Sequence, residues 1–494
     1  MDGSQTRVVG GHRVYTRPDL PVASLPAQTP AHEVANRLGS NLRTDLLGWG
    51  QDGALAARLA DEHHTVGGLV QALHAAIEDH LRTAAEVQPL APGHGVAGPH
   101  GTTYPIAQGP MTRVSDTARF ADAVAAGGAL PFLALALMPG HEVRALLEQT
   151  RDLLGDKPWG VGLLGFAPPE LLAEQLAVVK EVRPGVALVA GGRPSQAADL
   201  ESEGIDSYLH VPSLGLLDRF LKDGARKFIF EGRECGGHVG PLSSFVLWEA
   251  QLERLAQEKD VSGVHVLLAG GIHDARSAAM AAAALAPLAA RGAKVGVLMG
   301  TAYLFTAEAV AGGAIEQTFQ DVAVECVTTS LVETAPGHAT RCVETGFVRA
   351  FEARKAELVA AEVPAQERWA ELEQLNLGRL RIASKGLVRE ETGLNRVDVE
   401  RQLDEGMYMI GEVATLRSRP TTVASLHDEV SRGSTEWFAE PSRASVRERE
   451  ANPLDIAVVG LGSLLPGSSD TESFWADVLA ARDTVREVPT SRWD

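Results

Sequence analysis

The sequence predicts an α/β fold in which eight parallel strands, each followed by a helix, close into a (β/α)8 TIM barrel. Two observations lead to it. From Tyr104 onward, short apolar runs alternate with helix-length amphipathic segments, as each crossover between parallel strands requires. Glycine-rich turns also follow many of the runs instead of only the first, which favours a closed barrel over an open doubly wound sheet.

The elements of this barrel can be placed along the chain. Apolar residues at helical spacing predict helices that include 116–126, 142–154, 169–182, 214–223, 245–257 and 275–290. Apolar runs of strand length predict strands at 105–108, 130–135, 159–164, 187–190, 207–211, 227–230, 265–269 and 294–299. The carboxyl ends of such strands form the face on which these barrels carry their chemistry.

Shifts in composition divide the chain into five parts. Several prolines punctuate an extended lead-in, after which helical spacing recurs within 31–49 and 55–87. The predicted parts are a mostly helical N-terminal segment at 1–98, the barrel at 99–350, a helical C-terminal extension at 351–417, a linker at 418–452 and the start of a further domain at 453–494.

Charge and cysteine content exclude several classes of protein. A formal net charge of −19 argues against a nucleic-acid binder, because neutralising phosphates requires a basic surface. Three cysteines, Cys235, Cys326 and Cys342, indicate no disulfide framework, so a reducing cytoplasm is the expected location. No apolar run reaches the roughly 20 residues of a membrane span, so no membrane partner is expected. His63 and His64 lack the companions of a metal site, and no metal is expected.

The stretch 228–241, FIFEGRECGGHVGP, carries the strongest chemical signal. A short apolar strand is followed by a loop with two adjacent glycines, Gly236 and Gly237, and then His238. The glycines let the backbone approach a flat ligand, and His238 can donate or accept a proton near neutral pH. We therefore expect His238 to be catalytic at the carboxyl end of a barrel strand.

The neighbours of this histidine have less definite roles. Glu231 and Glu234 are either proton donors or loop carboxylates that anchor backbone amides. Cys235 is expected to be a packing group, because the sequence pairs no base with it. His210, within the fifth predicted strand, is expected to lie in the barrel interior or behind the catalytic residues.

Glycine turns after two other strands predict a phosphate site. The seventh strand runs into Gly270 and Gly271, the eighth into Gly300 and Thr301, and each turn leads into a helix. An isolated pair of glycines is often only a tight turn, but two such turns on consecutive strands can bind phosphate through backbone N–H groups and helix dipoles. A site with these phosphate-binding turns at one end and the Gly236–Gly237 loop for a flat ring at the other predicts a mononucleotide ligand such as FMN.

Seven motifs, in order, resemble the FMN-dependent enoyl reductases and nitronate monooxygenases, which share one flavin-binding barrel. The motifs are QGPM, KPWGVGLL, AGGRPS, HVPS, FIFEGRECGGHVGP, LLAGGIHDARSA and VGVLMGTAYLFTAEA, within about residues 104–350. The resemblance implies that His238 is the catalytic histidine. The cofactor-binding residues expected for FMN are Gly109, Pro110, Met111, Gly162, Gly192, Glu231, Gly236, Gly237, Gly270, Gly271, Gly300 and Thr301. At Gly162 relatives often carry an asparagine, so one flavin contact must be replaced or lost.

Segments beyond the barrel carry two further predictions. Residues 326–347 are expected to return over the active-site face as a strand or loop, where Arg341 either meets a phosphorylated or thioester substrate or is structural. Residues 375–386 and 405–411 resemble the carboxyl extension of enoyl reductases that serve polyunsaturated fatty acid and polyketide synthases.

The last forty residues resemble the opening of a β-ketoacyl synthase domain. Residues 455–467, DIAVVGLGSLLPG, precede FWADVLAARDTVREVP and SRWD. GLGSLLPG alone is a weak dinucleotide-loop signal, but the sequence that follows favours the synthase. The nucleophilic cysteine of such a synthase does not occur here, so this part is expected not to condense acyl units.

Together the resemblances imply an enoyl reductase domain of a multifunctional polyketide or polyunsaturated fatty acid synthase. It would reduce an α,β-unsaturated thioester on an acyl carrier protein with hydride from NAD(P)H by way of FMN, beside the ketosynthase. The alternatives are a nitronate monooxygenase-type flavin oxidase and a non-catalytic scaffold or docking module of the synthase. A homodimer is an open option for its assembly.

Overall fold

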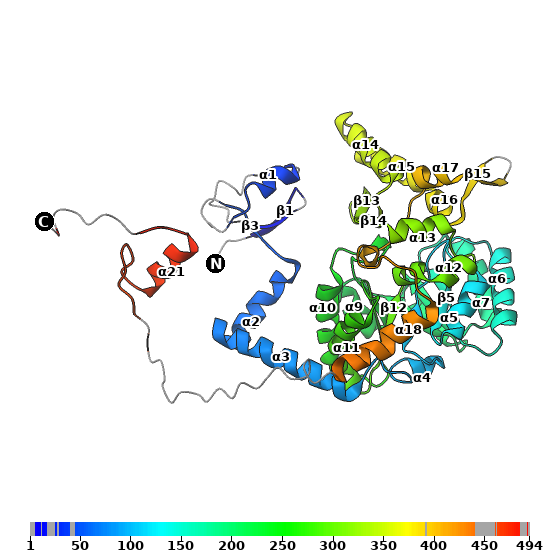
Figure 1. Ribbon diagram of the computed structural model, residues 1–494, viewed down its shortest axis with the longest axis horizontal. Helices are drawn as coiled ribbons and strands as arrows, with labels where there is room; N and C mark the ends of the chain where they lie inside the picture. Colours follow the sequence, from blue (N-terminus) through cyan, green and yellow to red (C-terminus); the bar gives the residue numbers. More distant parts are fainter. Residues whose placement is uncertain are drawn as a thin grey trace. The chain divides into compact units, whose positions relative to one another are not determined.

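Two compact units make up the chain. The computed structural model describes residues 5–10, 12–16, 25–26, 29–39, 45–390, 393–439, 460, 462–484 and 492. One unit comprises Met1–Val70 with Arg447–Asp494, and the other, Gln71–Val446, contains the barrel (Figure 1). The predicted linker beyond residue 439, and residues 455–459 and 461 of the predicted synthase motif at 455–467, lie outside the described residues.

Eight parallel strands form a closed barrel, which confirms the predicted fold class. Their order around the barrel is β11-β12-β4-β5-β6-β7-β8-β9. Every strand boundary lies within one residue of its predicted position. The strands are β4 (Ile106–Gln108), β5 (Leu130–Ala134), β6 (Gly160–Leu164), β7 (Val186–Ala190), β8 (Asp206–His210), β9 (Lys227–Glu231), β11 (His265–Ala269) and β12 (Lys294–Met299).

Helices surround the barrel because each presents an apolar stripe to the strands. In α6, for example, Val143, Leu147 and Leu154 are buried at helical spacing. An acidic cap begins α11, where the Asp274 carboxylate accepts a hydrogen bond from the Ser277 N–H at 2.8 Å. The helices are α5 (Ala118–Ala126), α6 (Gly140–Leu154), α7 (Pro169–Val182), α8 (Pro194–Glu201), α9 (Leu214–Lys222), α10 (Ser244–Ala256), α11 (Ala275–Ala290), η3 (Thr301–Phe305), α12 (Ala307–Ala311) and α13 (Gln317–Val324).

A short helix, α4 (Ala97–His100), and a buried hydrogen-bond chain close the amino end of the barrel. The His100 Nε2 lies 2.8 Å from the Tyr208 hydroxyl, which lies 2.9 Å from the His265 Nδ1. Tyr208 is buried inside the barrel among apolar side chains such as Phe132. Side chains therefore fill this end, as in other eight-stranded barrels.

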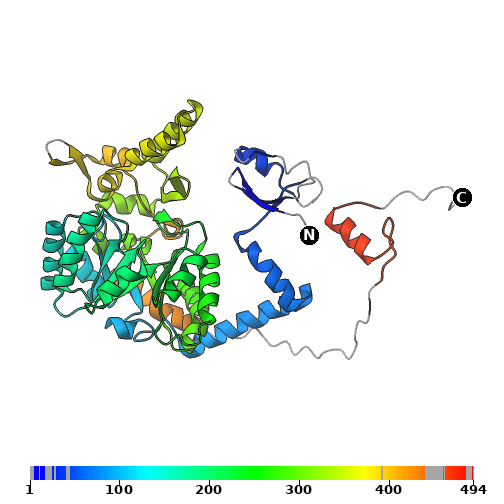
Figure 2. The ribbon, with the colours of Figure 1, turned by 180° about the vertical axis from the view of Figure 1, so that it is seen from behind.

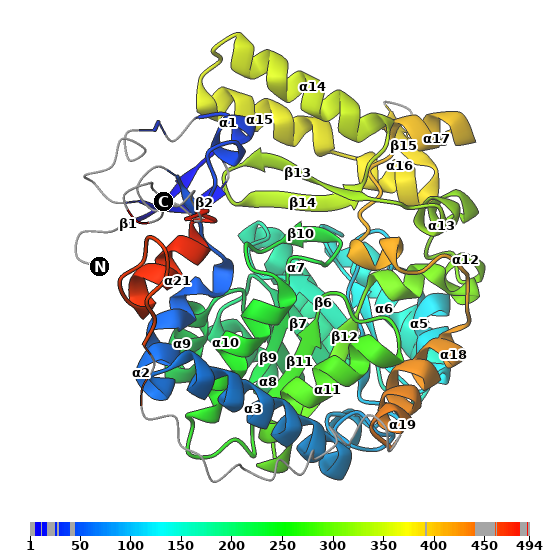
Figure 3. The same ribbon diagram turned by 60° about the vertical axis from the view of Figure 1, so that its left-hand side comes forward.

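A small antiparallel sheet covers the carboxyl end, so residues 326–347 return over this face as predicted. Its strand order is β10-β14-β13, with β10 (Gly237–Val239), β13 (Thr329–Ala335) and β14 (His338–Val343). Val332, Phe347 and Leu372 form a core between this sheet and two long helices. We call residues 326–417 the cap (Figures 2 and 3); its other elements are α14 (Gly346–Ala360), α15 (Ala365–Asn376), α16 (Arg379–Lys385), β15 (Leu387–Glu390), β16 (Gly393–Arg396), α17 (Val399–Glu405) and η4 (Glu412–Thr415).

Helices follow the cap where the sequence predicted a linker. They are α18 (Val423–Asp428), η5 (Glu429–Gly433) and α19 (Ser434–Ala439). The buried His427 places its Nε2 2.7 Å from the hydroxyl of the barrel residue Tyr303 and its Nδ1 2.8 Å from the Gly127 carbonyl oxygen. The linker prediction is therefore wrong for residues 423–439, because buried apolar and polar contacts hold them against the barrel.

The first unit contains a sheet that the sequence did not predict. β1 (Gln5–Val9), β2 (His12–Thr16) and β3 (Leu47–Gly48) are antiparallel neighbours. Helix α1 (Ala31–Ala35) ends well before the predicted boundary at 49 and contributes Val34 to a small core. Helical structure resumes in η2 (Gln51–Leu55) and α2 (Ala56–His63), and α21 (Thr471–Leu479) lies near the carboxyl terminus of the sequence. Helix α3 (Val66–Val87) begins in this unit and continues into the second.

Replacing Tyr208 by Phe should destabilise the barrel. The change leaves two buried imidazoles without their shared hydroxyl, which costs about 1–3 kcal/mol. Urea denaturation followed by tryptophan fluorescence measures the loss. Tyr104→Phe is the matched control, because that hydroxyl lies 3.5 Å from the exposed Asp428 carboxylate. Equal midpoints for the two variants would contradict the assigned role of the buried chain.

The barrel should lose stability as the pH falls from about 6.5 towards about 4. Burial lowers the pKa values of His100, His265 and His427 from 6.5 to about 4. Unfolded histidines therefore bind protons in this window while the folded ones stay neutral, so protons favour unfolding. Urea midpoints measured at pH 7.5, 6.0 and 5.0 should fall in that order. An unchanged midpoint across this series would show that the histidines are not buried as described.

Candidate active site

A cavity of about 260 Å³ lies at the carboxyl end of the barrel strands, beneath the cap. The cap contributes Leu380, Met409 and Val413 to its lining. The barrel contributes predicted residues from the ends of β4, β9, β11 and β12, which the closed sheet brings together. The predicted residues that line this cavity are Gly109, Pro110, Met111, Glu231, Gly236, Gly237, His238, Gly270, Gly271, Gly300 and Thr301.

Two predicted residues, Gly162 and Gly192, do not line this cavity. A Cβ added at Gly162 would lie 2.2 Å from the Cβ of Pro110. Pro110 thus occupies the space into which an asparagine would project, and glycine permits this packing in place of the predicted flavin contact. Gly192 borders an adjoining cavity, where an added Cβ would lie 2.4 Å from the Val189 Cγ1.

The turns after β11 and β12 leave open space for a phosphate group. Gly271 has φ +84°, and a Cβ there would meet only the Glu234 Cβ, at 4.0 Å. A Cβ at Gly300 would lie 3.6 Å from the Met111 Sδ. In the part of the chain that the structure describes, the backbone N–H groups of Gly271 and Thr301 have no acceptor. These features fit the phosphate end of FMN.

Helix dipoles contribute less to this cradle than the sequence predicted. The Asp274 carboxylate already caps the first turn of α11, and its negative charge lies at that helix terminus. After β12 comes η3, a single short 3-10 segment instead of a long α-helix. Backbone N–H groups are therefore the main donors that the two turns offer to a phosphate.

His238 lies on β10 and reaches the cavity from the small sheet of the cap. It is paired with Thr340 of β14, and Gly237 with Arg341. His238 is exposed to solvent on one side, so partial loss of surrounding water lowers its pKa only in part; Glu373 opposes this shift and His338 adds to it. The imidazole is therefore mostly neutral at pH 7, with one nitrogen able to donate a hydrogen bond and the other able to accept one.

Two carboxylates of the same loop differ in role. The Glu234 carboxylate accepts hydrogen bonds from the Ser244 N–H at 2.8 Å and from the Ser244 hydroxyl at 2.6 Å, at the start of α10. Of the two predicted roles, proton donor or carboxylate that anchors backbone amides, these contacts favour the second for Glu234. The Glu231 Oε2 instead lies 3.6 Å from the His210 Nε2, and both side chains line the cavity. His210 is thus part of the cavity wall and not behind it.

Two other residues of interest are structural. Arg341 is buried; its guanidinium contacts Glu412 and donates to the Thr329 hydroxyl at 2.7 Å and to the Arg233 carbonyl oxygen at 3.0 Å. The substrate-binding alternative for Arg341 is therefore wrong. Burial raises the pKa of Cys235 well above its ordinary value, and Glu231 raises it further, as expected of a packing thiol.

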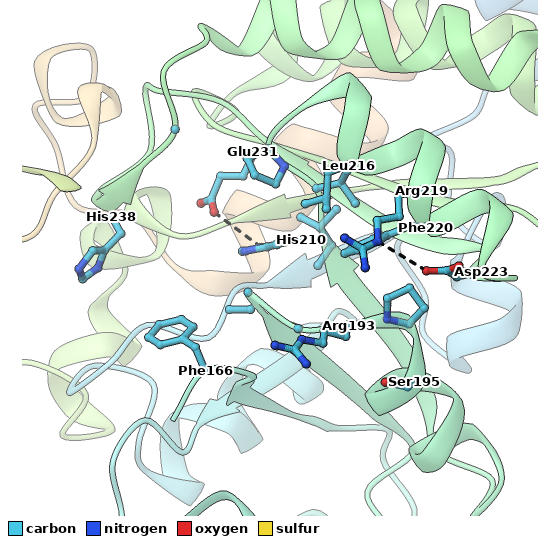
Figure 4. A pocket seen from close by; sticks show the side chains of 18 of the residues that line it. Phe166, Arg193, Ser195, His210, Leu216, Arg219, Phe220, Asp223, Glu231 and His238 are labelled. Atoms are coloured by element: carbon cyan, nitrogen blue, oxygen red, sulfur yellow. Dashed lines mark ion pairs between the residues drawn. The ribbon is translucent and has the colours of Figure 1, made fainter. Parts of the chain in front are cut away.

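A larger adjoining cavity of about 930 Å³ opens between the β7–α8 and β8–α9 turns. It shares Phe166, His210, Glu231 and His238 with the first cavity, so the two meet at the candidate catalytic residues (Figure 4). The sequence did not predict this second space. The AGGRPS motif at 190–195 lines this cavity and could have indicated it, but the sequence predicts only a cofactor-binding role for the motif.

The described residues contain neither a membrane-spanning helix nor a cluster of metal ligands. Within those residues, no helix is long and apolar enough to cross a membrane. No group of three or more His, Cys, Asp or Glu side chains among them is arranged to hold a metal ion.

Comparison with known families finds two matches in this chain. The sequence profile described as nitronate monooxygenase matches residues 170–432, which is more than half of the chain. The profile described as beta-ketoacyl synthase, N-terminal domain, matches residues 454–494. The second match begins within two residues of the predicted start at 453.

Individual relatives agree with these families. FabK from Thermotoga maritima is 25% identical with a TM-score of 0.56, over 70% of this chain and 96% of that one. The (3aS,4S,5R,7aS)-5-hydroxy-7a-methyl-1-oxo-octahydro-1H-indene-4-carboxyl-CoA dehydrogenase of Mycobacterium tuberculosis is 31% identical over 246 residues, 49% of this chain; the match spans 64% of that protein, less than two thirds. Polyketide synthase PksN of Bacillus subtilis is 34% identical over 58 residues, 12% of this chain and 1% of that protein.

Gly271→Ala should reduce retention of a flavin. The added methyl group would project into the open turn and strain a backbone at φ +84°. Gly204→Ala is a matched control, because Gly204 has φ +81° and nothing within 4 Å of an added Cβ, away from the cavity. Flavin absorbance per polypeptide after purification should fall only for Gly271→Ala. Similar losses in both variants would assign the effect to backbone strain alone.

Proposed function

The chain belongs to the nitronate monooxygenase family, and we propose that its barrel is an enoyl reductase domain of a multifunctional polyketide or polyunsaturated fatty acid synthase. The observation that carries the proposal is the presence of this barrel and a β-ketoacyl synthase start in one chain. The proposed substrate is an α,β-unsaturated thioester on an acyl carrier protein, with NAD(P)H as reductant. Three buried free cysteines suit a cytoplasmic location.

The proposed reductase domain is longer than the sequence suggested. We assign it to residues 99–439, comprising the barrel, the cap and the three helices that replace the predicted linker. The ketosynthase start is assigned to residues 453–494, as predicted, and the N-terminal segment to residues 1–98. A ketosynthase is therefore the proposed neighbour of the reductase within the synthase.

The residues around the first cavity suit FMN. When bound, FMN would take a hydride from NAD(P)H and deliver it to the β carbon of the enoyl thioester. The turns at Gly271 and Gly300 would hold its phosphate through backbone N–H groups. The open backbone at Gly237, with φ +82°, and the polarizable Met111 would face its ring.

The remaining chemistry falls to the protein. Adding a hydride to the β carbon places negative charge on the thioester oxygen and requires a proton at the α carbon. His238 is mostly neutral, so its N–H can donate a hydrogen bond to that oxygen or pass a proton to the α carbon. The products are a saturated acyl thioester and NAD(P)+. Glu231 and His210, which line the same cavity, can position the enoyl thioester next to the His238 imidazole.

A nitronate oxidase and a scaffold make different predictions from a reductase. An oxidase would consume O2 with a nitroalkane and would not need NAD(P)H. A scaffold would purify without flavin. Anaerobic bleaching of the flavin by NAD(P)H, followed by its reoxidation with a crotonyl thioester, supports the reductase; reoxidation by O2 and nitroalkane alone would overturn it.

His238→Ala should slow only the second half of the cycle. Bleaching of the flavin by NAD(P)H should stay within a few-fold of wild type, whereas reoxidation by crotonyl thioester should slow by about 10²–10⁴-fold. Stopped-flow absorbance at the flavin bands measures both steps. His141→Ala, an exposed histidine on α6, is the control and should change neither. Wild-type reoxidation by His238→Ala would remove this residue from the mechanism.

A further inference from the structure

Two arginines line the outer part of the larger cavity. Arg193 follows β7 at the start of α8, and Arg219 lies on α9. Figure 4 shows them on two walls of the same space, with Ser195 beside Arg193. Because α8 and α9 follow neighbouring barrel strands, two cations separated in the sequence lie on one opening.

Neither arginine is neutralised by a close carboxylate. Arg193 is exposed, and among the residues that the structure describes it forms no ion pair. The Arg219 Nε lies 4.0 Å from the Asp223 Oδ2, at the outer limit of such a contact. Some arginines of the barrel pair closely, as Arg144 does with Glu181 at 2.5 Å, and others pair more loosely, as Arg183 does with Glu203 at 3.4 Å. Both side chains are exposed, Arg219 by 78%, so the two guanidinium groups are accessible to an anionic ligand at the opening of the cavity.

The cavity joins these cations to the candidate catalytic residues. Its middle is lined by apolar side chains, among them Leu216, Phe220 and Ile229. Its inner end is formed by His210, Glu231 and His238. A ligand that fills it would therefore carry a negative group at one end, an uncharged arm along the apolar wall and a reactive group at the imidazole.

We propose that this cavity is a subsite for a phosphate ester at the end of an elongated organic arm, with the phosphate held by Arg193 and Arg219. The inference rests on the proposed reductase function. Two ligands of that reaction have this chemistry: the phosphopantetheine arm of the acyl substrate and the phosphate-bearing nicotinamide nucleotide. Arginine suits both, because its planar fork donates two parallel hydrogen bonds to phosphate oxygens.

The test compares ligands with and without the phosphate. Equilibrium binding of crotonyl-phosphopantetheine, crotonyl-pantetheine and NADPH is measured by calorimetry for wild type, Arg193→Ala, Arg219→Ala and the double variant. Each single change should weaken the phosphate ligand about tenfold, which corresponds to about 1.4 kcal/mol. Crotonyl-pantetheine should bind all four proteins equally. Lys222→Ala, on α9 and outside the cavity lining, is the matched control.

Each outcome of this comparison decides the proposal. Loss confined to crotonyl-phosphopantetheine assigns the subsite to the acyl arm, and loss confined to NADPH assigns it to the nicotinamide nucleotide. Asp223→Asn should strengthen the same ligand, because it removes the carboxylate that competes for Arg219. Unchanged binding of both phosphate ligands in the double variant would overturn the subsite.

Binding and turnover also separate this inference from the proposed function. A protein that binds the phosphate ligand through these arginines but reduces no enoyl thioester would retain the subsite and lose the reductase assignment. A protein that reduces enoyl thioesters with equal KM for phosphorylated and unphosphorylated pantetheine would retain the reductase assignment and lose the subsite.

Discussion

The candidate site depends on a backbone-to-backbone contact between the loop after β9 and the end of the cap. A Cβ at Gly236 would lie 2.7 Å from the Gly411 backbone nitrogen, so both positions require the absence of a side chain. The Glu412 N–H donates to the Glu234 carbonyl oxygen at 2.9 Å, and the Gly411 N–H donates to the Thr301 hydroxyl at 2.9 Å. One crossing thus joins the histidine loop, the cap and a turn of the phosphate cradle.

Buried charge reinforces this crossing. Arg341 on β14 contacts Glu412 beside the crossing and donates to the Arg233 carbonyl oxygen in the histidine loop. Arg341 is buried, whereas the Glu412 side chain is 39% exposed, so solvent screens one side of this ion pair. The β10–β14 pairing then fixes the backbone of His238 from the other side. The loop that carries His238 is therefore held by the cap, which is far from it in sequence.

The sequence predicted what local pattern determines and missed what distant contacts determine. Apolar runs such as Lys294–Met299 identify their own strands, because every barrel strand is buried on both faces. By contrast, the sequence predicts that Gly236 lets a ligand approach the backbone, but in the structure Gly236 packs against the backbone of Gly411 in the cap. From sequence, Gly162 is expected to replace an asparagine that contacts the flavin in relatives, whereas in the structure it packs against Pro110. His210 looked like an interior strand residue, although it ends β8 at the cavity.

For the proposed reductase, the two cavities suggest how one barrel would accept a substrate that remains attached to a carrier. The smaller cavity lies under the cap and offers backbone donors, whereas the larger one opens between α8 and α9 and is apolar along its middle. A tethered thioester needs a passage from outside to the reacting atoms, since the carrier protein itself is too large to enter. Because both spaces end at His238 and Glu231, an arm that enters through the larger one delivers its thioester to the residues that face the smaller one. The proposed cofactor cradle and the arm-sized passage are thus separate spaces with His210 and His238 between them, an arrangement that suits the proposed reduction on a carrier.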